Sequence, residues 1–165
     1  MPTVRDQAHL PSLGSHERAE VGNQLQEELV ELVDLSLLGK QLHWSIVGPQ
    51  FRELHLYLDE LVDSWRELAD TVAERAVAIG AWPDGQAATI AAGSALEGVE
   101  RGAIVDVELV RLLSSRLAEV AERTRERAKR ISELDPASED VLIEVTRAIE
   151  EQLWMVRASA PAEDD

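Results

Sequence analysis

Proline is confined to the borders of the periodic apolar stretches in this chain, at positions 2, 11, 49, 83, 136 and 161. Because proline breaks a helix from within, these positions divide the sequence into blocks that can each form one long helix. Apolar residues recur every three or four positions in each block, which predicts helices over about 16–45, 50–79, 104–132 and 138–158. Ser15 and Ser138 stand at the expected starts of the first and last helices, where serine caps free backbone N–H groups.

The connections between these blocks differ in length. Those after the first and third blocks are short, so each joins two antiparallel neighbours. The second connection, residues 81–103, is rich in Ala and Gly and long enough to cross the bundle, with room for a short helix around 94–99. The second and third helices can then run parallel. Since no β-hairpin signal is present, we expect an all-α, ferritin-like four-helix bundle over residues 16–158, with tails at 1–15 and 159–165.

The charge balance limits the possible partners. The chain has 32 Asp and Glu residues against 16 Lys and Arg residues, a formal net charge of −16. Such a surface repels nucleic acid and anionic membranes and attracts cations, although it also serves solubility alone. The absence of cysteine excludes thiolate nucleophiles and Cys-based zinc or iron–sulfur sites. No apolar run is long enough to span a bilayer and no signal peptide is visible, so we expect a cytoplasmic protein without membrane contact.

Five metal-ligating side chains form a pattern in the first two blocks. His55 and Asp59 are four residues apart, as are Asp70 and Glu74, so each pair lies on one helix face. The eleven residues from Asp59 to Asp70 return to nearly the same face at about 100° per residue. His43 ends the first helix, where antiparallel packing would set it beside His55. The alternative interpretation is surface charge together with two core histidines satisfied by hydrogen bonds.

The two pairs are too far apart to hold one ion in one chain. Asp59 and Asp70 are separated by about 16 Å along the helix axis, whereas metal–oxygen and metal–nitrogen bonds are about 2 Å long. A second copy, packed antiparallel about a two-fold axis near Ser64 and Trp65, would bring its acidic pair to the first chain's site. Two equivalent sites per dimer would result. Imidazoles with carboxylates suit Fe, Mn or Zn, and open positions suit redox iron that must meet an oxidant.

The same residues carry a resemblance to a known family. Residues 40–51, KQLHWSIVGPQF, followed by His55, Asp59 and the Asp70-x-x-x-Glu74-Arg75 run, resemble the Dps family of mini-ferritins in every spacing. The run from 154 to 157, WMVR, is similar to the family's last helix. The resemblance covers residues 16–158 and implies a four-helix subunit in a hollow, spherical dodecamer built from two-fold dimers.

The resemblance also implies a chemistry. Members of the family oxidise Fe(II), preferentially with hydrogen peroxide, at ferroxidase sites with one or two irons. They store the ferric mineral inside the shell, which protects against oxidative stress. The residues carried over are His43, His55 and Asp59 from one chain, with Asp70 and Glu74 from its mate.

The resemblance gives an expected role to one further group of residues. The turn before the last helix holds the acidic cluster expected to line an ion-entry pore, Glu133, Asp135, Glu139 and Asp140. Negative charge in the first turn of a helix is also favourable without any pore. Trp44 and Trp65 lie close to the site in sequence or by symmetry. Either would intercept a stray oxidising equivalent or simply pack in the core.

Binding to DNA is a second candidate function, because many family members use basic tails for it. Here the segment before residue 16 is not basic and the last six residues, APAEDD, are acidic. The basic run is Arg123, Arg125, Arg127, Lys129 and Arg130, which we expect to form a solvated or salt-bridged face. Weak or no DNA binding is therefore predicted. A metal-dependent hydrolase at the same site, or a purely structural cage, are the remaining alternatives.

Overall fold

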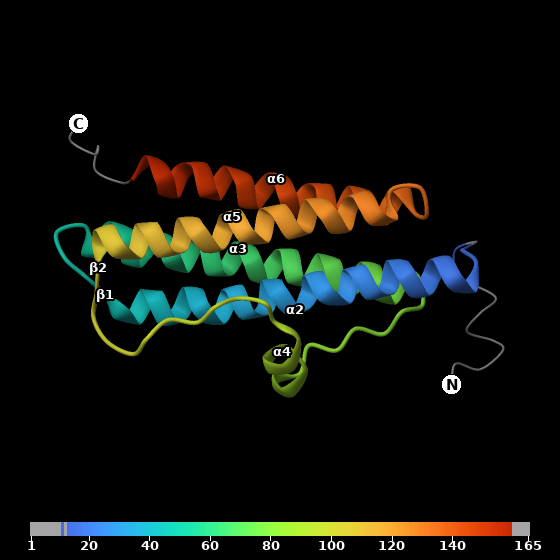
Figure 1. The fold of residues 1–165 in the computed structure, drawn as a ribbon, viewed down its shortest axis with the longest axis horizontal. Helices are drawn as coiled ribbons and strands as arrows, with labels where there is room; N and C mark the ends of the chain where they lie inside the picture. The colour runs from blue at the N-terminus through green and yellow to red at the C-terminus, as the bar shows by residue number, and fades with distance from the viewer. Residues whose placement is uncertain (1–10, 12, 160–165) are drawn as a thin grey trace.

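The structure, a computed structural model, describes residue 11 and residues 13–159; the rest of the expected tails at 1–15 and 159–165 lies outside the described residues. Four long helices build the described part of the chain (Figure 1): α2 (Ser15–Ser45), α3 (Phe51–Ala78), α5 (Asp106–Ile131) and α6 (Pro136–Ala158). A short helix, α4 (Ala87–Gly93), lies in the connection from α3 to α5. Among the described residues, none of the helices combines the length and the hydrophobicity needed to cross a membrane.

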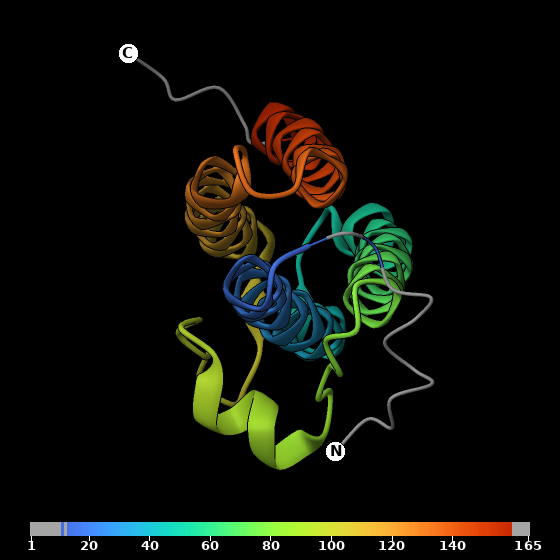
Figure 2. The same cartoon turned by 90° about the vertical axis from the view of Figure 1, so that its right-hand side faces the viewer.

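The long helices form two antiparallel hairpins that pack into one bundle. Figure 2 views the bundle from its end, with α2 and α3 against α5 and α6 and with α4 outside, next to α2. The connection from α3 to α5 returns along α2 to the opposite end, so α3 and α5 run parallel (Figure 1). The predicted all-α bundle with one long crossover is confirmed.

The core is made of the inward apolar stripes of the four helices. Fully or almost fully buried leucines come from every helix, for example Leu32, Leu58, Leu113 and Leu142. Trp65 of α3 is also fully buried and donates Nε1–H to Gln152 Oε1 at 2.7 Å, which ties α3 to α6. At Gly39 of α2 a Cβ atom would stand 2.6 Å from both Trp65 and Val62. Glycine at this position therefore allows α2 to approach α3 closely.

Two helix starts differ from the prediction. α2 begins at Ser15 itself, and Gly14 occupies the cap position, with no side-chain capping bond. α6 begins at Pro136, after the cap position at Asp135, and not at residue 138. Proline suits the first helical position because its φ is already helical and its missing N–H has no partner to lose. Ser138 lies inside the first turn and donates its hydroxyl to Asp135 Oδ2 at 2.5 Å.

The short helix of the crossover was predicted in the wrong place. It spans residues 87–93 and not 94–99, and Ser94 is its C-terminal cap residue. Asp84 organises its start, accepting hydrogen bonds from Thr89 Oγ1 at 2.7 Å and from Gln86 N at 3.0 Å. Four alanines in the helix explain the position, because alanine has the highest helix propensity and needs no periodic apolar stripe.

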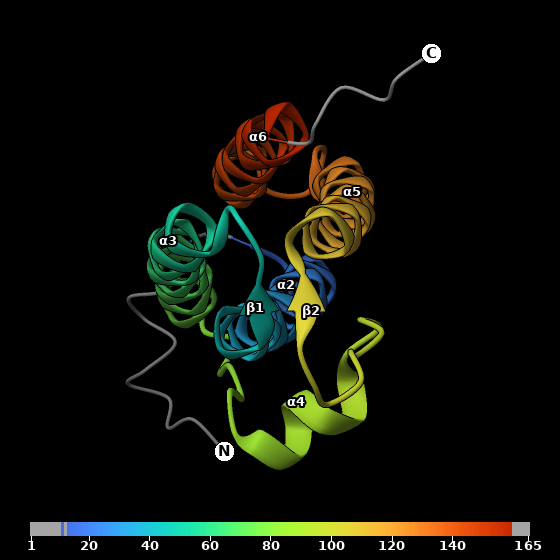
Figure 3. The same ribbon diagram turned by 90° about the vertical axis from the view of Figure 1, so that its left-hand side faces the viewer.

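A two-residue β-bridge joins the ends of the two hairpins. β1 (Ile46–Val47) follows α2 and pairs in parallel with β2 (Ile104–Val105), which precedes α5 (Figure 3). The predicted third helix therefore begins at Asp106, two residues later than expected. Asp106 Oδ2 accepts a hydrogen bond from Gln50 N at 3.0 Å, which fastens the α2–α3 turn to the start of α5.

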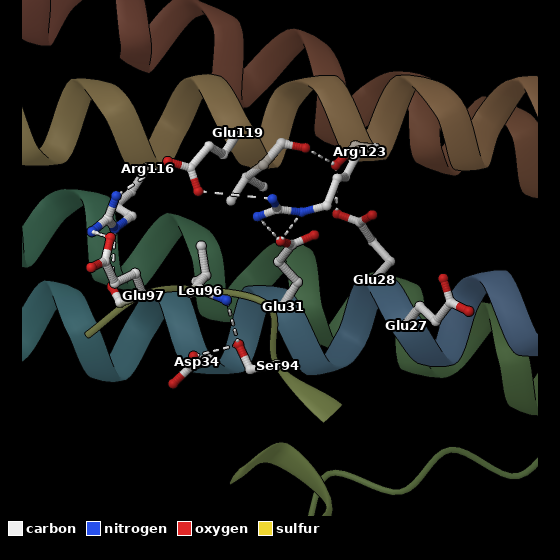
Figure 4. Close-up of polar contacts among 12 residues, drawn as sticks. Glu27, Glu28, Glu31, Asp34, Ser94, Leu96, Glu97, Arg116, Glu119 and Arg123 are labelled. Carbon is white, nitrogen blue, oxygen red and sulfur yellow. Dashed lines mark hydrogen bonds and ion pairs between the residues drawn. The ribbon is translucent and has the colours of Figure 1, made fainter. Parts of the chain in front are cut away.

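A buried ionic network joins α2 to α5 (Figure 4). Glu28 and Glu31 of α2 are 0% and 1% exposed, and Arg127 Nη1 donates to both, at 2.8 and 2.5 Å. Thr124 Oγ1 donates to Glu28 at 2.9 Å. Arg123 Nε donates to Glu31 at 2.6 Å, and Figure 4 labels both of these residues. The predicted pairing of the basic run with carboxylates is confirmed for these arginines. Of the predicted solvated or salt-bridged face, the salt-bridged form applies to Arg127, which is also buried.

Candidate metal centre

Two histidines face each other where α2 passes into α3. His43 belongs to the last turn of α2 and His55 to the first turns of α3. Their rings stack with centroids 3.6 Å apart and planes at 21°. His43 Nδ1 donates to the His55 carbonyl at 2.8 Å, and His55 Nδ1 donates to the His43 carbonyl at 2.9 Å. The expectation that antiparallel packing sets the two side by side is confirmed.

These reciprocal hydrogen bonds decide the tautomer of each ring. A carbonyl oxygen only accepts, so the proton of each neutral imidazole sits on Nδ1. Each Nε2 then keeps an unshared electron pair, which is the form in which histidine binds a metal. Metal-ligating histidines in general are oriented by such a bond from the other ring nitrogen. The α2–α3 turn therefore prepares two nitrogen ligands.

Asp59 adds a carboxylate one turn further along α3. Its Oδ1 lies 3.3 Å from His43 Nδ1 and accepts a hydrogen bond from Lys40 Nζ at 2.6 Å. The Lys40 hydrogen bond is the largest influence on the Asp59 carboxyl and lowers its pKa, and the nearby His43 acts in the same direction. Sequence reasoning missed Lys40. Its position three residues before His43, on the same face of α2, was the available signal.

Asp70 and Glu74 lie further along the same helix. Both are exposed, and about 16 Å of helix separates Asp70 from Asp59. In the part of the chain that the structure describes, no group of three or more His, Cys, Asp or Glu side chains converges closely enough to hold a metal ion. Within its described residues, one chain therefore places His43 next to His55 and Asp59 without completing a three-ligand site, and leaves the acidic pair apart from them.

The two tryptophans near the site have different surroundings. Trp65 is fully buried and bonded to Gln152, so the core role holds for it. Trp44 is 70% exposed, and the core role does not hold for it in the single chain. Lys40 Nζ lies 5.8 Å from the centroid of the Trp44 ring. Trp44 is thus an exposed aromatic residue next to the candidate ligand His43, in contact with Lys40.

The residues predicted to line a pore also differ among themselves. Glu133 and Asp140 are exposed and Glu139 is half-buried. Asp135 is buried, and its Oδ2 lies 2.7 Å from Arg75 Nη2 at the end of α3. Burial acts to raise the pKa of the Asp135 carboxyl, but hydrogen bonds from Ser138 and Arg75 outweigh it and leave the pKa lowered. Asp135 therefore anchors α6 to α3, and the pore role of the cluster stays a prediction.

Substituting Asp135→Asn is expected to destabilise the chain by about 1–2 kcal/mol at pH 7, because charge-assisted hydrogen bonds to Arg75 and Ser138 are weakened. A carboxyl with a lowered folded-state pKa stabilises the fold above its unfolded pKa of about 3.9, and this contribution disappears as the pH falls through the folded-state value. Thermal unfolding from pH 7 to pH 3 should show the gap between parent and variant closing below pH 4. Asp140→Asn, exposed on the same helix, is the control; a gap of equal size there would remove the assigned role of Asp135.

Comparison with known proteins identifies the family of the chain. A family model described as a ferritin-like domain matches residues 22–160. A DNA protection during starvation protein of Mycolicibacterium smegmatis is 33% identical over 153 residues, covering 90% of this chain and 81% of that protein. DNA protection during starvation protein 2 of Deinococcus radiodurans is 33% identical over 149 residues, but the chain spans only 62% of its length.

Solved structures give the same result. The Dps of Mycobacterium smegmatis in its tetragonal form superposes with a TM-score of 0.86 at 31% identity, covering 91% of this chain and 92% of that one. Both the sequence and the fold are therefore shared over most of the length with proteins of one kind. The chain belongs to the Dps family of ferritin-like proteins.

Proposed function

We propose that this chain is the subunit of an iron-storing mini-ferritin that oxidises Fe(II), preferentially with hydrogen peroxide. The site consists of His43, His55 and Asp59 from one copy and Asp70 and Glu74 from a second copy. The observation that carries the proposal is the histidine pair, whose backbone hydrogen bonds leave both Nε2 atoms free to bind a metal. Iron is the substrate here, and the stored ferric mineral is the product.

The surface beside the acidic pair supports a second copy. A groove between α2 and α3 runs past Asp70 and Arg66, and its floor is apolar, with Leu29, Val33, Leu37, Ala69 and Ala73 among its lining residues. Leu37 of α2 is 56% exposed at this groove. An isologous dimer across this face would cover these side chains and bring each acidic pair to the other chain's histidines. We infer that such dimers build a hollow oligomer, with a dodecamer as the expected size.

The ligand set accounts for the direction of the reaction. Carboxylates stabilise Fe(III) more than Fe(II), because the higher charge interacts more strongly with anions, so electron loss is favoured. Two Fe(II) ions each give one electron to hydrogen peroxide. The O–O bond breaks, two protons are taken up, and two water molecules form, so no hydroxyl radical needs to be released. The chain's own part is to hold the ions through imidazole nitrogen and carboxylate oxygen and to keep the rings oriented.

Protection of DNA would follow from this chemistry and not from DNA binding. The relatives of Deinococcus and Mycolicibacterium are named for DNA protection during starvation. In this chain, Arg123 and Arg127 of the basic run are engaged with carboxylates of α2, and the net charge is −16. Removal of peroxide and Fe(II) protects without any phosphate contact. Entry of iron past Glu133, Glu139 and Asp140 fits the same negative potential.

The experiment loads the assembled protein with Fe(II) without oxygen, adds stoichiometric hydrogen peroxide and follows ferric absorbance. We expect the double variant His55→Ala, Asp59→Ala to oxidise iron at least about 100-fold more slowly, since even outer-shell changes at metal sites cost about 10–100-fold. The control is His16→Ala, Glu122→Ala, two exposed residues of matching chemistry. Equal rates in parent and site variant, or iron precipitating outside the protein, would refute the proposal and favour the hydrolytic or structural alternatives.

A further inference from the structure

Lys40 occupies the candidate metal centre as a cation. Its ammonium lies 2.6 Å from Asp59 Oδ1, the same oxygen that lies 3.3 Å from His43 Nδ1. The Lys40 side chain is 25% exposed and reaches across from α2 to α3. A metal bound by the histidines and Asp59 needs this carboxylate for itself. The ammonium and the metal therefore compete for one anion.

Resting on the proposed function, we propose that Lys40 competes with the incoming divalent cation for Asp59 and thereby sets the affinity of the site. Without metal, the ammonium neutralises Asp59 and keeps the carboxylate beside the histidines. With metal, the ammonium must leave Asp59, because two positive charges at one carboxylate oxygen repel each other. Lys40 thus sets the affinity of the site and does not itself bind iron.

The structure offers a place for the displaced ammonium. The Trp44 ring centroid is 5.8 Å from Lys40 Nζ, within the range of a cation–π contact. The ammonium already lies over this ring, and Trp44 is 70% exposed, so the ammonium can keep the ring contact and meet water after it leaves Asp59. A lysine has four rotatable methylene groups and a compact charge, which makes such a movement easy. The displacement needs no rearrangement of α2 or α3.

The competition acts on every divalent cation that needs Asp59, and the histidines separate these cations by ligand preference. Fe(II), Co(II) and Zn(II) bind imidazole nitrogen well and gain two such ligands when they displace Lys40. Mg(II) and Ca(II) prefer oxygen and gain little from His43 and His55. Lys40 weakens both classes by the same factor, since both need Asp59. Lys40 therefore raises the cation concentration needed to fill the site, so that the weakly bound oxygen-preferring ions do not fill it. The ratio of the binding affinities of the two classes is unchanged.

The test is an equilibrium titration of the assembled, metal-free protein with Co(II), followed by its visible absorbance and by calorimetry. Lys40→Met is expected to tighten Co(II) binding by about fivefold, the upper end for a partly exposed ion pair. Lys40→Gln, which keeps a polar side chain, should do the same and serves if Lys40→Met does not assemble. Mg(II) affinity should rise by the same factor.

The chain supplies a matched control in its second lysine. Lys129→Met removes the same charge from an exposed position on α5 and should leave Co(II) binding as in the parent. Affinities of the Lys40 variants that equal that of Lys129→Met, or fall below it, overturn the competition. If the parent bound no Co(II), or bound it equally well with His55→Ala, the proposed site itself would be refuted. Binding that depends on His55 but not on Lys40 refutes the inference alone.

Discussion

Replacing Arg127 with methionine is expected to lower the free energy of unfolding by about 3–5 kcal/mol, as removal of one partner from a buried ion pair does. Arg127 Nη1 donates to Glu28 and to Glu31, and both carboxylates are almost completely buried. Without the guanidinium, two neighbouring negative charges remain in the interior. Glu28 then depends on the Thr124 hydroxyl, and Glu31 on Arg123. Methionine fills most of the arginine stem volume, so the loss reports charge and not packing.

The substitution Glu28→Gln shows whether uncompensated charge is the cause. Burial is the largest influence on the pKa of Glu28 and raises it, although Arg127 acts against burial. A carboxyl with a raised folded-state pKa contributes most to stability below its unfolded pKa, and this contribution is lost as the pH rises through the folded-state value. We therefore expect Glu28→Gln to restore part of the stability in the Arg127→Met background. The loss caused by Arg127→Met alone should be larger at pH 8 than at pH 5.

Thermal unfolding at a fixed protomer concentration measures these differences, because assembly contributes to the stability of an oligomer. Arg125→Met is the control: it makes the same change on the same helix, at a side chain that is 63% exposed and paired with Glu150. Surface pairs contribute little, so the control should unfold like the parent. Equal losses for the two arginines, or simple additivity of Arg127→Met and Glu28→Gln, would show that the network is not coupled.

The buried network marks a limit of sequence reasoning. Glu28 and Glu31 stand between the apolar residues of α2, and charged residues at such positions normally lie on the surface. Their burial depends on Thr124 and Arg127, almost one hundred residues later, which reach them only because α5 packs on α2. Periodicity in one helix contains no information on its rotation relative to a distant one. The charged pairs between α2 and α5 could therefore not be predicted from the sequence.

The ligands within α3 were predictable for the opposite reason. A helix fixes the angle and the rise between its own residues, so the separation of Asp59 from Asp70 follows from counting. The closeness of His43 to His55 follows from a short turn between antiparallel helices. Lys40 was missed because its contact with Asp59 crosses from α2 to α3 and depends on how a long side chain bends. Distances within one helix can be calculated from residue numbers. Contacts of flexible side chains between helices cannot.

The connection from α3 to α5 was the part of the fold that the sequence predicted least well. The bridge between β1 and β2 has only two residue pairs. This is too short for the alternation of apolar and polar residues that predicts a strand, so the sequence did not indicate it. The short helix α4 has one buried apolar residue, Ile90, and thus no stripe either. Local hydrogen bonds of Asp84 and the propensity of alanine decide where it starts. Segments without periodicity are therefore the least predictable parts of this fold.

Mixing two inactive variants is expected to restore about a quarter of the parent's rate of Fe(II) oxidation. Asp59→Asn removes one ligand from both sites of a dimer, and Asp70→Asn removes another. In a heterodimer of the two, one site carries both substitutions and the other carries neither, as isologous symmetry requires. Random assembly from equal amounts makes about half of the dimers heterodimers, so about one site in four is intact. Asparagine keeps the size of the side chain, which leaves packing unchanged.

Co-expression with two different affinity tags, followed by sequential purification, isolates the mixed assemblies for the peroxide assay. The control pairs Asp59→Asn with His55→Ala, two changes in the same half of the site, for which no heterodimer contains an intact site. Recovery confined to the first mixture would place Asp70 in the partner's site. Recovery in both mixtures would mean that the single variants regain activity by another route.

If the mixture of Asp59→Asn and Asp70→Asn recovered no oxidation activity although heterodimers were present, one chain would have to supply the whole site. The geometry of α3 opposes that outcome, because about 16 Å of straight helix separates Asp59 from Asp70. No metal-binding group of three or more His, Cys, Asp or Glu side chains forms within residue 11 and residues 13–159 of a single copy. The inactivity of Asp70→Asn would then not come from a ligand missing in the partner's site, and the site shared between two copies would be refuted. Complementation therefore decides whether the two-fold interface is part of the iron chemistry or only part of the shell.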